Sequence, residues 1–410
     1  MAQTRFQRDE ELAKEKANQS NAIISAFQLA SGIGAYASTL YSLSLFRDML
    51  LFKLKKGDSE EGFTHVVKPR FNLLGSAAFF SNYLGSRWRA WIKQYDFVHL
   101  SSPDFFHLVK FNPSAVGTVH DIFSLEDKVT KKAYPASYRF YFARELEYID
   151  QMQGVVVISH VIQKKLKSLF PNTKLKLIHH WTSDAFRPRS KSEARQLLDL
   201  PDDKIILLNV SSDQPRKNLG ILPALMNRLG SDYLLVRIGP SSSIQRCLPQ
   251  GNFISIDEAP KDLYHYYFNA ADILLAPSRN EGFGRPVIEA INSGLPVVAS
   301  NIEVFKEIAL KAGLFCDPDD MVSWADAIEE LSSVETRSQI RESMKISYSD
   351  YYRAKRALTE YAKFYQEAGC VFDGIPQMVE PSIEYETEAI HAKRQDSATT
   401  ETPSLNLADN

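Results

Sequence analysis

The stretch Ala271–Ser300 reads ADILLAPSRNEGFGRPVIEAINSGLPVVAS, and the prediction of the fold starts from it. Its apolar run Ile273–Ala276 predicts a buried strand. A glycine-rich turn follows, and Val287–Asn292 then predicts a short helix that a Gly-x-Pro sequence ends. Val297–Ala299 begins the next strand. Strand, turn, helix and strand in this order are typical of a parallel sheet with helices on its faces.

Two carboxylates accompany the expected helix, Glu281 at its entrance and Glu289 inside it. The backbone N–H groups of a glycine turn and of a helix N-terminus suit a phosphate, and carboxylates accept hydrogen bonds from sugar or ribose hydroxyls. Taken alone, Glu281 is more typical of a residue in a solvated loop. The order of the elements around it favours a pocket for a sugar nucleotide.

This run resembles that of the retaining family 4 glycosyltransferases, P-S-x-x-E-G-F-G-x-P-x-x-E-A-x-x-x-G-x-P-V-V-A-S. The matching positions are Pro277, Ser278, Glu281, Gly282, Phe283, Gly284, Pro286, Glu289, Ala290, Gly294, Pro296, Val297, Val298, Ala299 and Ser300. Arg285 departs from the pattern, since an aliphatic residue is usual there.

The resemblance implies roles for the residues of this run. Glu289 is expected to accept from the ribose hydroxyls of the donor, and Glu281 to meet hydroxyls of its sugar. The N–H groups of Phe283 and Gly284, next to Gly282, are expected to point at the sugar or the phosphates. The resembled family works without a bound metal, so we expect neither a metal nor another cofactor.

Composition limits the remaining classes. The chain has 410 residues, a hydrophobic content of 44% and a net charge of −2, which favours two globular domains and gives no overall field for nucleic acid. Cys247, Cys316 and Cys370 show no metal or disulfide spacing, which fits a reducing cytosol. The charge-free stretch Ala17–Phe46 could span a bilayer, but its polar residues and central glycines favour a strand, a turn and a helix.

The order of expected elements predicts an α/β fold with two doubly wound, Rossmann-like domains that face each other across a cleft, the GT-B type that the resemblance implies. Helix Ala35–Leu51 follows the first strand, Ala22–Gln28. We expect an N-terminal extension (1–20), an acceptor-side domain (21–187), a nucleotide-sugar-binding domain (188–348), a helix crossing back to the first domain (349–370) and a disordered tail (371–410).

The expected strand Lys204–Val210 is followed by a basic turn, SSDQPRKNLG, that contains Arg216 and Lys217. A guanidinium and an ammonium at a strand's carboxyl end can neutralise a diphosphate, although such a pair can also be a solvated turn. Family members often carry P-R-K-N here. Their usual Gly–Arg is replaced by Ser211–Ser212, so Arg216 is expected to substitute for that arginine. Gly239 follows the expected strand that ends at Ile238. It either permits the backbone to approach the nucleotide base closely or is required only by the conformation of the turn.

The first domain supplies the opposite side of the expected site. Gly32 and Gly34 follow the first strand, and the resembled family has there a turn that approaches the donor phosphate and the acceptor. His120 could hydrogen-bond the donor sugar, with Asp121 orienting its ring; the alternative is a strand-end histidine bonded to backbone. His160, His179 and His180 are expected to be structural.

Two aromatic segments are candidates for the acceptor side. Ser86–Tyr95 places Trp88 and Trp91 on one helical face with basic residues beside it, which suits either an anionic membrane surface or an ordinary buried stripe. Tyr134–Tyr148 is expected to pack under the sheet or line the cleft. The cysteine pattern favours the cytoplasm as the location of the chain, and the segment Ser86–Tyr95 leaves peripheral contact with the inner membrane face as an option.

The expected site is that of a glycosyltransferase, and the resemblance implies that it retains the anomeric configuration. The donor is expected to be a GDP- or UDP-sugar, and the acceptor a hydroxyl of a carbohydrate or lipid-linked glycan. The catalytic residues are expected to be His120, Glu281, Arg216 and Lys217. Two alternatives remain at this point: a sugar-nucleotide epimerase or phosphorylase on the same fold, and a non-catalytic glycosyltransferase-like subunit.

Overall fold

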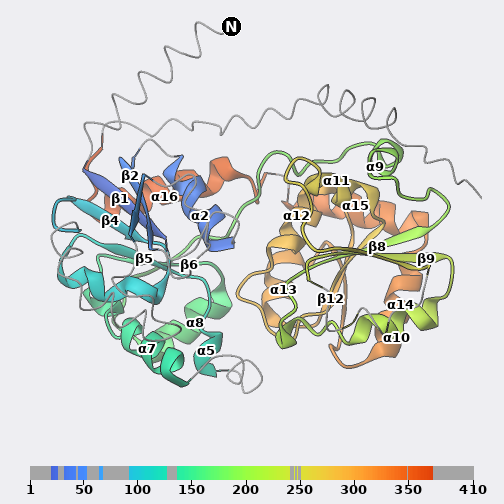
Figure 1. Ribbon diagram of the computed structural model, residues 1–410, viewed down its shortest axis with the longest axis horizontal. Helices are drawn as coiled ribbons and strands as arrows, with labels where there is room; N and C mark the ends of the chain where they lie inside the picture. Colours follow the sequence, from blue (N-terminus) through green and yellow to red (C-terminus); the bar gives the residue numbers. More distant parts are fainter. Residues whose placement is uncertain are drawn as a thin grey trace, which may run out of the picture. The chain divides into compact units, whose positions relative to one another are not determined.

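A computed structural model describes residues 20–25, 32–42, 45–52, 64–67, 92–126, 136–240, 244, 247, 251–348 and 350–372 (Figure 1). The described chain forms two parallel sheets covered by helices, which confirms the predicted α/β class with two Rossmann-like sheets. Within the described residues, no helix has both the length and the apolarity needed to cross a bilayer. The strand and helix found at 21–25 and 32–41 agree with the reading of the charge-free stretch.

The first sheet has seven parallel strands in the order β3-β2-β1-β4-β5-β6-β7. Its strands are β1 (Asn21–Ser25), β2 (Asp48–Phe52), β3 (His65–Val67), β4 (Phe97–Leu100), β5 (Val116–Val119), β6 (Val155–Val157) and β7 (Leu175–Leu177). Strand order reverses between β1 and β4. In such sheets ligands bind beyond the carboxyl ends of the strands at the reversal.

The second sheet has six parallel strands in the order β10-β9-β8-β11-β12-β13. Its strands are β8 (Ile205–Val210), β9 (Tyr233–Ile238), β10 (Phe253–Ile256), β11 (Ile273–Ala276), β12 (Val297–Ser300) and β13 (Gly313–Cys316). Here the order reverses between β8 and β11. The basic turn after β8 and the glycine turn after β11 therefore lie at the reversal point.

The helices connect these strands and cover both faces of each sheet. The α-helices are α2 (Gly32–Tyr41), α5 (Phe123–Glu126), α7 (Ala136–Leu146), α8 (His160–Leu169), α9 (Lys191–Leu198), α10 (Ile221–Leu229), α11 (Tyr264–Ala270), α12 (Arg285–Ser293), α13 (Glu303–Ala309), α14 (Met321–Glu330), α15 (Val334–Tyr348) and α16 (Ala354–Glu367). Three 3₁₀ helices within the described residues are η1 (Pro103–Lys110), η2 (Ile149–Gln151) and η3 (Pro215–Lys217).

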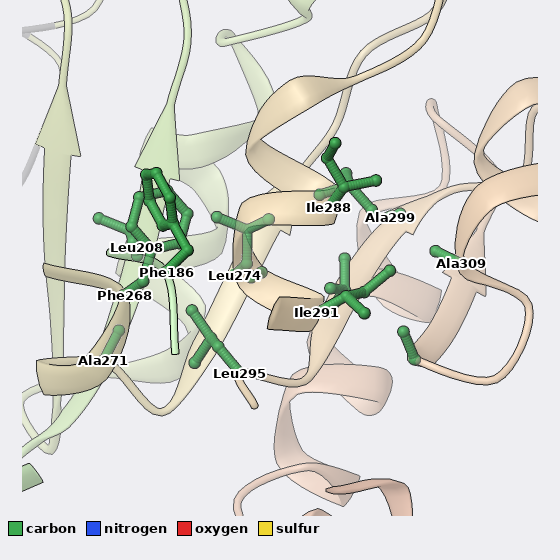
Figure 2. Packing of buried hydrophobic residues seen from close by; sticks show 14 of the residues in the cluster. Phe186, Leu208, Phe268, Ala271, Leu274, Ile288, Ile291, Leu295, Ala299 and Ala309 are labelled. Atoms are coloured by element: carbon green, nitrogen blue, oxygen red, sulfur yellow. The ribbon is translucent and has the colours of Figure 1, made fainter. Parts of the chain in front are cut away.

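Strand alternation distributes the core between the two faces of each sheet. In β1, Ile24 belongs to the cluster under η1, α7 and α8, whereas Ile23 faces the opposite cluster with α2 and α16. In β8, Leu208 packs with α11 and α12, and Leu207 packs with α10 and α14. Figure 2 shows Leu208 beside Phe186 and Phe268, with further residues of the same buried cluster on α12 and β12. Because neighbouring strand residues point to opposite faces and helices cover both faces, the central residues of these strands are apolar at successive positions.

One expected element is wrong. The segment Ala35–Leu51 was predicted to be one helix, but α2 ends at Tyr41 and the chain then forms strand β2. Met49, Leu50 and Leu51 are all buried, since β2 pairs with β1 inside the sheet. A continuous apolar run has no period that separates a buried strand from a helix.

Helix α16 packs on the first sheet although it follows the second in sequence. Tyr361 and Tyr365 share a core cluster with Phe97 of β4. The hydroxyl of Tyr361 lies 2.7 Å from that of Tyr36 on α2, and the hydroxyl of Tyr365 lies 2.6 Å from Nδ1 of His99. These buried polar contacts fix α16 against α2 and β4.

Candidate functional site

The basic turn and the glycine turn meet at one buried carboxylate, Glu281. Nη1 of Arg216 donates to Oε2 of Glu281 at 2.9 Å, and Nζ of Lys217 forms an ion pair with Oε1. Ser278 Oγ also donates to Oε1, at 2.7 Å. The chain thus brings together residues that are 64 and 65 positions apart, because β8 and β11 are neighbouring parallel strands.

Glu281 is 8% exposed, so its charge depends on these partners. Burial favours the neutral carboxyl, but the charges of Lys217 and Arg216 outweigh it, and the pKa of Glu281 lies below its usual value. The guanidinium of Arg216 also lies 5.0 Å from the ring centroid of Phe123, on α5 after the first sheet's β5. Arg216 therefore contacts chain segments from both sheets.

Local backbone chemistry explains the shape of the basic turn. Pro215 occupies the first turn of η3, where its fixed φ is compatible with the helix and its missing N–H costs nothing. Asn218 ends η3 with φ 55°, in the left-handed region that asparagine tolerates. The N–H of Arg279 then donates to the carbonyl of Arg216 at 2.8 Å, which joins the turn to the segment after β11.

The glycine turn requires its glycines for contact. A Cβ on Gly282 would lie 2.3 Å from the carbonyl oxygen of His120, and a Cβ on Gly284 would lie 2.6 Å from the ring of Phe305. Gly284 also has φ 105°, a conformation that disfavours side chains. Ser159, which caps α8, donates from Oγ to the carbonyl of Gly282 at 2.9 Å. The glycine turn therefore rests against the carboxyl ends of β5 and β6.

Phe283 and Glu289 continue this arrangement into the protein. The ring of Phe283 is 3% exposed and packs 5.3 Å from that of His180, centroid to centroid. Glu289 Oε2 accepts from the hydroxyl of Tyr264 at 2.9 Å, and Oε1 lies 3.8 Å from Nη2 of Arg285. Burial raises the pKa of Glu289, although the charge of Arg285 and the hydrogen bond from Tyr264 oppose the shift.

His120 lies beside the glycine turn at the end of β5. Its Nε2 lies 2.9 Å from the carbonyl of Ser101 and its Nδ1 lies 3.3 Å from Nε2 of His180. Since a carbonyl only accepts, His120 carries its proton on Nε2, and Nδ1 accepts from His180. The backbone contact named as the alternative for His120 is thus present.

Asp121 does not orient the ring, which corrects that expectation. Its Oδ1 accepts instead from the N–H of Phe123 at 3.4 Å. His180, expected to be only structural, stacks on His120 with ring centroids 5.2 Å apart. His179 pairs with Glu307 of α13 at 2.7 Å.

The structure explains the need for glycine at Gly239, whereas for Gly32 and Gly34 it gives only their place in α2. Gly239 has φ 118°, and a Cβ there would lie 2.1 Å from the carbonyl oxygen of Ser211, so its turn alone requires glycine. Gly32 begins α2 and Gly34 is buried in its first turn. Approach of these three glycines to a donor stays a prediction.

Arg237 was missed in the sequence, although an arginine inside the apolar run YLLVRI is unusual. It is fully buried and donates to Asn209 Oδ1 at 2.7 Å and to the carbonyl of Pro240 at 2.6 Å. Asn209 in turn donates to the carbonyl of Leu275 at 2.8 Å. These bonds join the carboxyl ends of β8, β9 and β11.

Several expectations fall wholly or partly outside the described residues. The segment with Trp88 and Trp91 is one of them, as are the extension and most of the tail. In α7, Tyr141 and Phe142 are buried whereas Phe140 is 64% exposed. Where the structure describes the chain, no group of three or more His, Cys, Asp or Glu side chains is placed to hold a metal ion.

Comparison with known proteins gives a family match for the second half. Residues 190–346 match the family "Glycosyl transferases group 1". A 234-residue region is 26% identical to the O-antigen chain mannosyltransferase RfbU of Salmonella typhimurium. That alignment covers 53% of this chain and 60% of the relative.

Solved structures share the fold over most of the chain. Sucrose-phosphate synthase from Thermosynechococcus elongatus superposes with a TM-score of 0.70 at 18% identity, over 85% of this chain and 99% of that one. Anabaena Alr3699/HepE, solved with UDP and glucose, gives a TM-score of 0.70 at 14% identity, over 85% and 100%. The two-sheet arrangement is thus the one found in GT-B glycosyltransferases.

Substitution Gly282→Ala tests the contact between the glycine turn and β5. The added Cβ meets backbone rather than a movable side chain, so we expect a loss of ~1–3 kcal/mol in the free energy of unfolding. The control is Gly220→Ala, where a Cβ has nothing within 4 Å. Chemical denaturation measures both, and equal stability of the two variants would contradict the contact.

Titration of His120 tests the electrostatics of the site. Burial lowers its pKa to about 4 against an ordinary value near 6.5, and the charge of Arg285 adds to the shift while the Ser101 carbonyl opposes it. The unfolded chain therefore gains a proton below pH ~6.5 that the folded ring takes up only near pH 4, and this group makes the fold less stable as pH falls through that interval. Histidine ¹⁵N NMR, assigned with His120→Gln, should show a neutral ring at pH 5.5; a midpoint near 6.5 would overturn this description.

Proposed function

We propose that this chain is a glycosyltransferase of the group 1 family, and that it moves a sugar from a nucleoside diphosphate sugar to a hydroxyl acceptor with retention of configuration. The observation that carries the proposal is the grouping of Arg216, Lys217 and Glu281 at the strand-order reversal of the second sheet. These residues and Glu289 all lie inside the segment that matches the family.

The charges of the site suit a diphosphate leaving group. When the bond to the sugar breaks, the diphosphate gains negative charge, and cations fixed in advance lower that barrier. Glu281 holds Arg216 and Lys217 in place before the donor arrives. Glu281 is bonded to both cations, and their guanidinium and ammonium groups have more N–H donors than these two ion pairs use, which suits phosphate oxygens.

The carboxylates suit the hydroxyls of the donor. Glu289 is buried with one oxygen bonded to Tyr264, and a second acceptor position remains for a ribose hydroxyl. Glu281 stands between the two cations, and a donor sugar bound there would complete its contacts. We propose His120 as the contact from the first sheet; a sugar hydroxyl bonding to its ring would displace Ser101 or His180.

In the proposed reaction the acceptor oxygen attacks the anomeric carbon on the face that the diphosphate leaves. The bond from the anomeric carbon to the phosphate oxygen breaks, the bond to the acceptor oxygen forms, and a phosphate oxygen takes the acceptor's proton. Retention follows from attack on that face. Arg216 and Lys217 stabilise the departing diphosphate throughout.

We propose a UDP- or GDP-sugar as the donor. The Anabaena protein of the same fold was solved in complex with UDP and glucose, which supports a nucleotide-sugar donor. The Salmonella relative is named for mannosyl transfer to an O-antigen chain, which supports a glycan acceptor. A lipid-linked acceptor with peripheral membrane contact stays part of the proposal, as does the absence of a metal cofactor.

A donor panel tests the function directly. Thermal shift with UDP-, GDP- and ADP-sugars should raise the melting temperature for at least one of them, because a ligand that binds only the folded chain stabilises it. The same sugar should release its nucleoside diphosphate when acceptor glycans are added. An epimerised or phosphorolysed product would favour the alternative enzymes, and binding without turnover would favour a non-catalytic subunit. No shift with any sugar would contradict the proposal.

Substitution Lys217→Met tests the role of the cations. It removes the charge but keeps most of the stem, and we expect kcat to fall by about 10²–10³-fold, as for loss of one group that stabilises developing charge. The matched control is Lys204→Met at the amino end of β8, where Nζ bonds Asn252 at 3.1 Å. Equal rates for the two variants would contradict the role of Lys217.

A further inference from the structure

We propose that Arg285 binds the phosphate that carries the donor sugar, as a third cation that acts from α12 while Arg216 and Lys217 act from the turn after β8. This inference rests on the proposed function and adds a catalytic residue to it. Within the glycine run, Glu281–Glu289, Arg285 stands at a position where the resembled family usually has an aliphatic residue.

The position of Arg285 in α12 places it in front of Glu289. It is the first residue of the helix, directly after Gly284, and Glu289 follows one turn later. Nη2 of Arg285 lies 3.8 Å from Oε1 of Glu289. The arginine side chain is 36% exposed and the glutamate side chain 5%, so the guanidinium reaches solvent and the carboxylate lies behind it.

The field of Arg285 also reaches the first sheet's histidines. Burial is the main cause of the low pKa of His120 and of His180, and the positive charge of Arg285 lowers both further. His120 stands at the end of β5, against Gly282 of the glycine turn. Arg285 therefore lies beside Glu289, on the helix that begins directly after the glycine turn, and the same turn contacts the backbone of His120.

The order of ribose, diphosphate and sugar in the donor then indicates that the diphosphate would lie near Arg285. Glu289 is proposed to hold the ribose and His120 to contact the sugar. In a nucleoside diphosphate sugar the diphosphate joins these two parts. A guanidinium offers two parallel donors that match two phosphate oxygens, which an aliphatic side chain at this position cannot do.

The charge balance of the site supports a third cation. Glu281 already offsets part of the charge on Arg216 and Lys217. The diphosphate leaves with more negative charge than it had in the donor, and a guanidinium already placed at the terminal phosphate stabilises that change. Arg285 would thus act on the leaving group as well as on affinity.

Calorimetric binding of UDP, UMP, GDP and GMP to the full-length protein tests the inference. For the base that the wild-type chain binds, Arg285→Leu should weaken the diphosphate about tenfold or more and leave the monophosphate within about twofold. Arg285→Lys keeps the charge without the paired donors, and its loss should be intermediate. The control is Arg228→Leu, because Arg228 is 42% exposed and lies 3.6 Å from Asp326 on the far helix pair α10 and α14.

The outcomes separate the two proposals. A wild-type chain that binds neither UDP nor GDP contradicts the proposed function itself. Wild-type binding of a diphosphate that Arg285→Leu leaves unchanged overturns the role of Arg285 while the proposed function stands. An equal loss for diphosphate and monophosphate also overturns it, because Arg285 would then act on the nucleoside through Glu289. With the transfer assay running, kcat should fall in Arg285→Leu at saturating donor.

Discussion

The buried carboxylate of Glu281, held between two cations, is the interaction on which the site depends. Arg216 and Lys217 come from the turn after β8, and Glu281 comes from the turn after β11. Their meeting requires these two strands to be neighbours, and the sheet order places them side by side. Removal of Glu281, or of the cations that pair with it, would leave an uncompensated charge in a poorly solvated place, and such a charge lowers the stability of the fold. The pairing therefore orders the two turns and keeps cations ready where a phosphate is proposed to bind.

A second constraint is the contact between the glycine turn and the first sheet. Gly282 lies against the carbonyl of His120 so closely that no Cβ fits, and Ser159 bonds the carbonyl of Gly282. This contact holds the end of β5, with His120, against the glycine turn. The same turn opens α12, so one short segment provides the acidic residue, the contact to the first sheet and the start of the helix. In the proposed transferase, the acidic residue recognises hydroxyls of the donor. The contact to the first sheet brings His120 to the site, and the start of the helix supplies Arg285 for the diphosphate.

Much of this was readable from residue order, and the exceptions have physical causes. Alternating apolar strands and helices predicted both sheets, and the run around Glu281 predicted the turn and helix that the structure shows. Strand β2 was missed because Met49–Leu51 is apolar throughout and has no distinguishing period. The bond of Asp121 to the N–H of Phe123 is local, and the His–Asp pair alone did not predict it. The stacking of His180 on His120 and the bond of Arg237 to Asn209 join chain segments that are far apart in sequence. Local patterns hold no information on such contacts, so only the fold reveals them.

A crystal structure with the preferred nucleoside diphosphate is the most direct measurement of the central claim. The account predicts the diphosphate at the carboxyl ends of β8 and β11, with its oxygens within hydrogen-bond distance of Arg216 and Lys217, and with the ribose at Glu289. A nucleotide bound elsewhere on the chain, or one whose diphosphate faces away from both cations, would contradict it.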